Sequence, residues 1–329
     1  IQMKAILWTK YGSSDGLQLD EVPKPIPKKD EILVKVHATT LTAGDIELQK
    51  LKLPMMLSFP MRLYVGLIKP KRITILGQEL AGEVEAVGKN VTSYKKGDQI
   101  FGTTGFGFGA HAEFVCLNAD PNEMQGALAS KPANITYAEA AAVPTAGFEA
   151  LHFLRKANVA RGQKILIFGA GGSIGTFSVQ LAKFFGAEVT CVDSAGKLDM
   201  LKSIGADFVI DFAKEDFTRN GVKYDVIIDV VGKKSFSRRL KSLKSNGYYL
   251  LANAGLSHII IGKWNSLTSS KMVVLGSASQ KKEDLLYLKE LIEAGQIKSI
   301  IDRCYPLEQV AEAHRYVETG SKKGNVSLT

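Results

Sequence analysis

The sequence predicts an α/β protein in which a β-rich part precedes a doubly wound parallel sheet. Up to residue 123, apolar and polar residues alternate, as in the segments 31–37 (EILVKVH) and 82–88 (GEVEAVG). Such alternation is typical of strands with one face in a core. Beyond Pro132, short and almost wholly apolar runs alternate with segments of helical spacing. This second pattern is typical of parallel strands that helices cover on both faces.

The second part opens with an alanine-rich segment, 136–157, whose spacing predicts a helix with Thr136 or Asn134 as its N-cap. Another helix is expected over 281–295, where leucines recur at helical spacing. Between these helices, the apolar runs predict strands at 164–168, 188–192, 207–210, 225–229, 248–252 and 272–276.

The segment after the last helix returns to a strand, a helix and a strand, and we expect it to rejoin the first part. The expected organisation is a β-rich domain made of residues 1–123 and 281–329, and a parallel-sheet domain made of residues 124–280. A chain of 329 residues with 45% apolar and 23% charged residues is long enough for two ordinary soluble domains.

The cysteines and the start of the chain indicate a cytoplasmic protein. Only three cysteines occur, far apart, so a disulfide framework is not expected and a reducing compartment is. We expect each thiol to be buried and inert. The first residues lack the apolar core and cleavage site of a secretory signal. The cysteines are Cys116, Cys191 and Cys304.

One apolar segment and two basic clusters remain. The segment 53–68 contains two prolines and an arginine and is shorter than the roughly 20 residues of a membrane span, so we interpret it as the lip of a pocket or a subunit contact. The net charge of +9 is concentrated at 69–72 (KPKR) and 233–244 (KKSFSRRLKSLK). The second cluster has helical spacing with the cations opposite its apolar stripe, which indicates a solvated helix more than a specific nucleic-acid surface.

The strongest functional pattern is a strand, a glycine turn and a helix. The strand 164–168 leads into Gly169-Ala170-Gly171-Gly172-Ser173-Ile174-Gly175, and a second strand ends at Asp193. A dinucleotide site needs small residues at a tight turn, where the backbone approaches a pyrophosphate, and where the helix packs on the strand. Ala170, Gly172 and Gly175 are assigned to these positions, so we expect a nicotinamide dinucleotide to bind here.

The choice between NADH and NADPH depends on residues beyond the turn. Asp193 can bind the ribose hydroxyls and repel a 2′-phosphate, so it favours NADH. Ser194 and Lys197 favour NADPH, unless the lysine is an ordinary solvated charge. Lys322 or Lys323 could also contribute to binding a 2′-phosphate. The expected cofactor-binding residues are Ala170, Gly171, Gly172, Ser173, Ile174, Gly175, Asp193, Ser194, Lys197, Phe212, Val231, Ala254 and Lys323.

The order of these motifs resembles the medium-chain dehydrogenase/reductase superfamily, in particular its zinc-independent quinone oxidoreductase branch. The carrying segments are ILGQELAGEVEAVG with YKKGDQIFG, AAAVPTAGFEAL before the glycine turn, KSIGADFVIDF, and the final KKGNVSLT. The resemblance covers almost the whole chain. It implies a GroES-like β domain joined to a Rossmann domain, an active site in the cleft between them, and dimers or tetramers, of which we expect a homodimer. It also implies that Phe212 favours NADH, because zinc-free relatives that use NADPH often have a tyrosine at this position, whose hydroxyl can reach the 2′-phosphate.

The resemblance also implies that the catalytic zinc of the related alcohol dehydrogenases is missing. Where those relatives have their zinc ligands, this chain has Thr42, Gln78, and Pro144 or Thr145. None is a usual ligand, and a catalytic zinc site needs about three. Only Cys116 lies in the region of the structural zinc lobe. We therefore expect no metal.

Without a Lewis acid, a localised alkoxide is difficult to stabilise, whereas hydride addition to a quinone or an α,β-unsaturated carbonyl leaves a delocalised anion. The expected function is zinc-independent, NAD(P)H-dependent reduction of such acceptors. Two alternatives stay open: a non-catalytic NAD(P)H-binding protein with a basic nucleic-acid surface, and an alcohol dehydrogenase with an atypical zinc site. The expected catalytic residues are Thr42, Asp45, Gln78 and Thr145, with Tyr64 as a possible lid residue and Asp45 either orienting its neighbours or purely structural.

Overall fold

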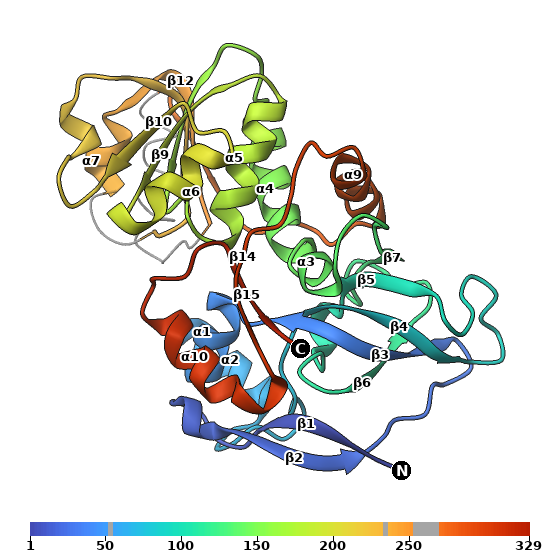
Figure 1. Ribbon diagram of the computed structural model, residues 1–329. Coiled ribbons are helices and arrows are strands. Elements are labelled where there is room, and N and C mark those ends of the chain that lie inside the picture. The colour runs from blue at the N-terminus through green and yellow to red at the C-terminus, as the bar shows by residue number, and fades with distance from the viewer. Residues whose placement is uncertain (52–54, 233–235, 253–269) are drawn as a thin grey trace. The chain divides into compact units, whose positions relative to one another are not determined.

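The computed structural model describes residues 1–51, 55–232, 236–252 and 270–329, and for 55–58 the backbone alone. These residues form two compact units (Figure 1). Unit 1 contains Ile1–Thr145, Ser279–Gly295 and Ser299–Thr329, and unit 2 contains Ala146–Ala278 and Gln296–Lys298. The C-terminal segment lies in unit 1. Residues 124–145, which the sequence analysis assigned to the parallel-sheet domain, also lie in unit 1.

Unit 2 is built on a parallel sheet whose strands lie in the order β10-β9-β8-β11-β12-β13. Numbered along the unit, this is the order 3-2-1-4-5-6 of a Rossmann fold, in which ligands bind at the carboxyl ends of the strands. The near-continuous apolar runs are explained by burial on both faces. The strands are β8 (Lys164–Phe168), β9 (Glu188–Asp193), β10 (Phe208–Asp211), β11 (Tyr224–Asp229), β12 (Leu243–Leu251) and β13 (Met272–Leu275).

Helices cover this sheet. α5 contacts β8 and β9, α6 contacts β10, and α7 contacts β12. α5 buries Phe177 and Leu181, which lie one turn apart on the face toward the strands. The helices of unit 2 are α4 (Pro144–Lys156, of which the first two residues belong to unit 1), α5 (Ser173–Phe184), α6 (Leu198–Ser203) and α7 (Phe236–Leu240).

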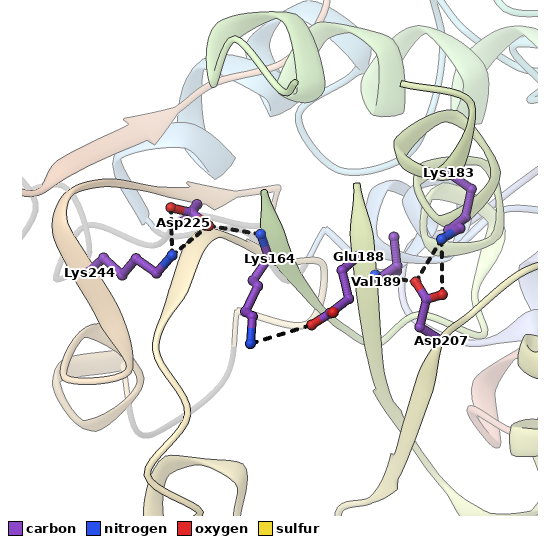
Figure 2. A network of polar contacts seen from close by, with 7 residues as sticks. All are labelled: Lys164, Lys183, Glu188, Val189, Asp207, Asp225 and Lys244. Carbon is purple, nitrogen blue, oxygen red and sulfur yellow. Dashed lines mark hydrogen bonds and ion pairs between the residues drawn. The ribbon is translucent and has the colours of Figure 1, made fainter. Parts of the chain in front are cut away.

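A chain of ion pairs connects the amino ends of the strands of unit 2 (Figure 2). Lys164 at the start of β8 pairs with Glu188 at the start of β9 at 3.7 Å, and its backbone N–H donates to Asp225 of β11 at 2.8 Å. Lys183 pairs with Asp207 at 2.7 Å. Exposed pairs of this kind contribute about 0–1 kcal/mol each. Because this edge is opposite the carboxyl ends of the strands, where such folds bind ligands, the network links neighbouring strands and is not expected to form part of a ligand site.

Unit 1 contains a two-stranded antiparallel ribbon, β1-β2, and a sheet with the order β14-β15-β3-β4-β5-β7, in which β6 also pairs with β3. The C-terminal strand β15 pairs with β3 through Ser327 and Thr40, so the end of the chain completes this sheet. The strands are β1 (Gln2–Trp8), β2 (Leu17–Pro23), β3 (Glu31–Thr40), β4 (Glu79–Val87), β5 (Gln99–Thr103), β6 (Phe114–Asn118), β7 (Leu128–Ser130), β14 (Ile301–Tyr305) and β15 (Asn325–Leu328).

Helix boundaries in unit 1 follow capping chemistry. The expected helix over 136–157 is two helices, because Pro144 begins a new one. Thr136, and not Asn134, is the N-cap of the first, in a capping box with Glu139. None of the described helices is long and apolar enough to cross a membrane. The helices that begin in unit 1 are α1 (Ala43–Lys50), α2 (Met55–Val65), α3 (Tyr137–Ala141), α4, α9 (Lys282–Glu293) and α10 (Val310–Glu318).

The predictions for the basic cluster and for two of the cysteines were wrong. The basic cluster 233–244 does not form one solvated helix: α7 ends at Leu240, Leu243 begins β12, and residues 233–235 lie outside the described residues. Within this cluster, Arg239 is 7% exposed and therefore buried. Of the three cysteines that were expected to be buried, Cys191 is buried, Cys116 is half-buried and Cys304 is exposed.

Candidate functional site

The glycine turn begins directly after β8. Gly169 has a φ of +79°, and a Cβ there would lie 2.6 Å from Val231 Cγ2. The tight turn is therefore made by Gly169, one residue before the position assigned from the sequence. This explains why Ala170, which is fully buried, can replace a glycine.

The two later glycines have different surroundings. A Cβ at Gly175 would lie 2.4 Å from the carbonyl oxygen of Ala170, so α5 and the turn touch backbone to backbone. A Cβ at Gly172 would have only Gly169 O, at 3.7 Å, within 4 Å. Gly172 is the N-cap residue of α5, where N–H groups and the helix dipole favour an anion. The turn thus has the open backbone and the helix N-terminus that a pyrophosphate requires.

Asp193 ends β9 and closes the other side of the turn. Its side chain accepts hydrogen bonds from the N–H groups of Gly171 and Ser194, each at 2.7 Å. It also pairs with Lys197 at 3.4 Å, and these two side chains are only 8% and 10% exposed. Lys197 is therefore not an ordinary solvated charge, and it partly neutralises the carboxylate that was expected to exclude a 2′-phosphate.

A second polar cluster lies at the carboxyl end of β11. Asp229 Oδ1 accepts the N–H groups of Val231 and Gly232 at 3.1 and 2.9 Å, and its Oδ2 accepts from Arg239 and Tyr249 at 2.5 Å each. Burial raises the pKa of the Tyr249 hydroxyl, so the tyrosine donates. Asp229 thus caps the turn that follows β11, and it also anchors a buried arginine. This cluster fixes the loop that packs on Gly169.

The other expected cofactor residues are more scattered. Phe212 is 54% exposed and Val231 37% exposed. The backbone N–H of Lys323, in unit 1, donates to Asp302, while Lys322 is buried and donates to Gly324 O at 2.6 Å. Ala254 lies outside the described residues. These assignments stay predictions.

Two of the expected catalytic residues satisfy each other in unit 1. Thr42 is the N-cap of α1, and its side chain accepts from the backbone of Asp45 in a capping box. The Thr42 hydroxyl donates to Asp45 Oδ2 at 2.7 Å. Asp45 is 4% exposed, and its Oδ1 has no hydrogen-bond partner among the described residues. Both side chains thus stabilise the N-terminus of α1.

Gln78 lies in the bend before β4. Gly77 precedes it with a φ of +92°, and a Cβ there would lie 2.5 Å from His111 Cδ2. The backbone oxygen of Gln78 accepts from Thr104 N at 2.8 Å. Its side chain is half-buried, and the structure shows no hydrogen bond from its amide to any described residue. Among the four expected catalytic residues, Gln78 has the side chain available to a substrate.

The next residue, Glu79, was missed from the sequence. It is 2% exposed and begins β4. Its carboxylate accepts from the Thr40 hydroxyl at 2.5 Å and from the Thr145 backbone N–H at 2.8 Å. Burial raises its pKa to about 7, although these hydrogen bonds oppose the rise, and the charge of Asp45 adds to it. A single acid in the apolar run 73–82 was the signal in the sequence.

The structure thus brings Gln78 and Thr145 together through Glu79, and Thr42 together with Asp45. Tyr64, the possible lid residue, is 39% exposed and has the Arg72 guanidinium 4.2 Å from its ring. The segment 53–68 contains α2, and its residues 53 and 54 lie outside the described residues.

The donor chemistry does not fit a catalytic zinc. Thr42 offers a hydroxyl, Gln78 an amide and Thr145 a hydroxyl, none of which is a usual zinc ligand. Over the described parts of the chain, no group of three or more His, Cys, Asp or Glu side chains is arranged to hold a metal ion.

Comparison with known proteins agrees with this architecture. The family described as alcohol dehydrogenase GroES-like domain matches residues 28–147, and the family described as zinc-binding dehydrogenase matches residues 204–328. Along the chain, the GroES-like match precedes the match that contains the later strands of the parallel sheet.

Full-length relatives are similar along nearly the whole chain. The 2-methylene-furan-3-one reductase of Solanum lycopersicum is 32% identical over 99% of this chain and 79% of its own length. The NADPH-dependent alkenal/one oxidoreductase of Arabidopsis thaliana chloroplasts is 29% identical over 99% of this chain and 79% of its own. The structure of the quinone oxidoreductase from Coxiella burnetii superposes with a TM-score of 0.87 at 28% identity, covering 100% and 99% of the two chains. The chain therefore belongs to the medium-chain dehydrogenase/reductase superfamily, in its quinone-oxidoreductase-like branch.

Proposed function

We propose that this protein is a zinc-independent, NAD(P)H-dependent reductase of quinones or α,β-unsaturated carbonyl compounds. The relatives named above are a furanone reductase, an alkenal/one oxidoreductase and a quinone oxidoreductase, which share a conjugated acceptor as substrate. The observation that carries the proposal is the combination of an intact glycine turn, open at Gly172, with Gln78 where zinc-dependent relatives have a histidine ligand.

The residues of the turn fit a nicotinamide dinucleotide. The N-terminus of α5 would hold the pyrophosphate at Gly172, and Asp193 with Lys197 would meet the adenosine ribose. The bound cofactor supplies the hydride.

The substrate carbonyl requires a hydrogen-bond donor, because negative charge develops on its oxygen as the conjugated system accepts the hydride. The Gln78 amide would donate this bond. The anion is delocalised, so a neutral donor suffices where an isolated ketone would need a Lewis acid. Thr42 and Asp45 would shape the site by fixing the start of α1, and Thr145 would do so from the start of α4.

The cofactor preference that we propose is NADH over NADPH, from Asp193 and Phe212, but by a modest margin. Lys197 offsets part of the repulsion that the carboxylate exerts on a 2′-phosphate. A replacement Asp193→Asn removes the charge and keeps an acceptor for the Gly171 N–H. We expect it to raise NADPH affinity about tenfold, corresponding to about 1.4 kcal/mol, with NADH affinity changed less than about threefold. A wild type that already prefers NADPH contradicts the preference for NADH.

The test of the function is turnover of a panel of quinones, enones, isolated ketones and alcohols, each with both nicotinamides. We expect activity with the conjugated acceptors alone, and we expect it to persist in chelator with far less than one zinc per chain by metal analysis. Stoichiometric zinc would favour the alcohol dehydrogenase alternative. Absence of turnover together with tight, sequence-selective nucleic-acid binding at physiological salt would favour the binding-protein alternative.

A further inference from the structure

Glu79 joins three segments that are far apart in the sequence. Its Oε1 accepts the hydroxyl of Thr40 at the end of β3, and its Oε2 accepts the N–H of Thr145 in the first turn of α4. Its own backbone oxygen accepts the Thr39 hydroxyl at 2.7 Å. Because Gln78 is the preceding residue, one carboxylate determines where the segments bearing Gln78 and Thr145 lie relative to each other.

This carboxylate is costly to bury. Among the described residues, no Lys, Arg or His nitrogen lies within 4.0 Å of Glu79, so hydroxyl and N–H groups alone replace its water. Transfer of a carboxylate out of water without a cation costs several kcal/mol. An apolar or small residue would satisfy the packing of β4, whose next residues are Leu80 and Ala81. Buried acids that are kept at such a cost are concentrated at functional sites.

We propose that Glu79 is a positioning residue for the reduction: through its hydrogen bonds to Thr40 and Thr145, it holds the Gln78 amide where that amide can donate to the substrate carbonyl. The proposal rests on the reductase function proposed above. Glu79 itself is fully enclosed and touches neither substrate nor cofactor.

The ionised form of Glu79 is the effective one. A carboxylate accepts from the Thr145 N–H more strongly than a neutral acid does, and it also interacts favourably with the N-terminus of α4. Burial raises the pKa of Glu79 to about 7, so its charge changes near neutral pH. The charged group that acts on Glu79 is Asp45 of α1, and His111 bonds the backbone carbonyl of its partner Thr40 at 2.9 Å. His314 of α10, whose pKa burial lowers to about 4, interacts in turn with Asp45 and His111.

The experiment compares wild type with Glu79→Gln, Glu79→Asp and the control Glu149→Gln. Glu149, on α4, is another carboxylate that accepts a backbone N–H, from Ala278 at 3.0 Å, and burial raises its pKa as well. In wild type, we expect kcat to rise about tenfold between pH 6 and 8, because a charge-assisted bond is roughly twice as strong as a neutral one. Glu79→Gln should be independent of pH at the acid-limb value of wild type, with the KM for the nicotinamide unchanged.

Glu79→Asp should retain an inflection at a lower kcat, and Glu149→Gln should retain the wild-type profile. If Glu79→Gln keeps the inflection, or if Glu149→Gln loses it, the proposal is wrong. A second readout does not need turnover: hydrogen exchange of the amides of residues 145–148, which begin with the Thr145 N–H that Glu79 holds, should be faster in Glu79→Gln than in wild type at pH 8, and equal exchange overturns the proposal. A wild type that reduces no conjugated acceptor at any pH contradicts the proposed function, while the exchange measurement still decides whether Glu79 holds Thr145.

Discussion

The two glycines Gly172 and Gly175 should respond oppositely to replacement by alanine. A Cβ at Gly175 would lie 2.4 to 2.6 Å from three backbone atoms of Ala170. Backbone atoms cannot rotate away as a flexible side chain can, so α5 would have to move from the turn. Overpacking of this kind costs about 1–3 kcal/mol. Gly172 has a φ of −86° and only one neighbour, at 3.7 Å, so alanine is accommodated there without strain.

For nicotinamide binding, we expect the larger direct effect at Gly172. At Gly172, the added methyl group occupies the space through which the pyrophosphate approaches the N–H groups of the turn. Loss of one charge-assisted hydrogen bond costs about 1.5–3 kcal/mol, which weakens binding by about 10- to 100-fold. Gly172→Ala should therefore keep the melting temperature of wild type and lose affinity, whereas Gly175→Ala should lower the melting temperature first.

Thermal unfolding by circular dichroism and titration of NADH and NADPH by calorimetry measure the two effects separately. For a protein of this size, a melting temperature falls by about 2–4 °C for each kcal/mol. Wild-type affinity in Gly172→Ala would refute the placement of the pyrophosphate at this residue. A wild-type melting temperature in Gly175→Ala would refute the close contact between α5 and the turn.

Gly77 and Gly97 share a φ of +92°, but a Cβ at Gly77 would lie only 2.5 Å from a buried histidine, whereas a Cβ at Gly97 would have nothing within 4 Å. In urea denaturation, Gly77→Ala should therefore be less stable than Gly97→Ala by about 1–3 kcal/mol. Arg239→Met should cost about 3–5 kcal/mol of unfolding free energy because it leaves a buried carboxylate unpaired, whereas Arg238→Met, at a side chain 56% exposed, should cost less than about 1 kcal/mol; equal effects would contradict the burial. The pKa of Glu79 is raised from 4.5 to about 7, so the stability that this group contributes is complete below pH 4.5 and is lost as the pH rises through 7. Glu79→Gln should therefore flatten the fall in unfolding free energy between pH 5 and 8 by up to about 3 kcal/mol. An unchanged slope would count against the raised pKa.

Local patterns in the sequence were sufficient for the parallel strands and for the glycine turn. Apolar runs of strand length report burial on both faces, and the strand, turn and helix of 164–184 are contiguous, so no distant partner was needed to find them. Periodicity failed at 233–244. There, Leu243 continues the helical stripe of Phe236 and Leu240, but it starts β12, which pairs with β11. This pairing is a long-range interaction, and the local spacing of apolar residues gives no information about it.

Buried charges were harder to predict for the same reason. Arg239 lies three residues after Phe236, on the edge of an apolar stripe, yet its burial depends on Asp229 and on the ring of Phe168, 3.7 Å from the guanidinium carbon. Glu79 depends on Thr40 and Thr145 in the same way. A charge is buried where distant residues supply its partners, and a single sequence does not identify those partners.

The hydrogen-bond inventory of unit 1 also limits the chemistry that its residues can support. Thr42 and Asp45 satisfy each other, and both the backbone N–H and the side chain of Thr145 are hydrogen-bonded to Glu79, so the Gln78 amide is the donor that stays available among the four expected catalytic residues. One preorganised donor of this kind stabilises an oxyanion by about 3–4 kcal/mol. A localised alkoxide needs more than this hydrogen bond. In metal-dependent enzymes, the metal ion contributes several kcal/mol of stabilisation in addition to such hydrogen bonds. An enolate or a hydroquinone anion already spreads its charge over the conjugated system, so in the proposed function a single neutral amide is enough, and we expect this site to reduce conjugated acceptors.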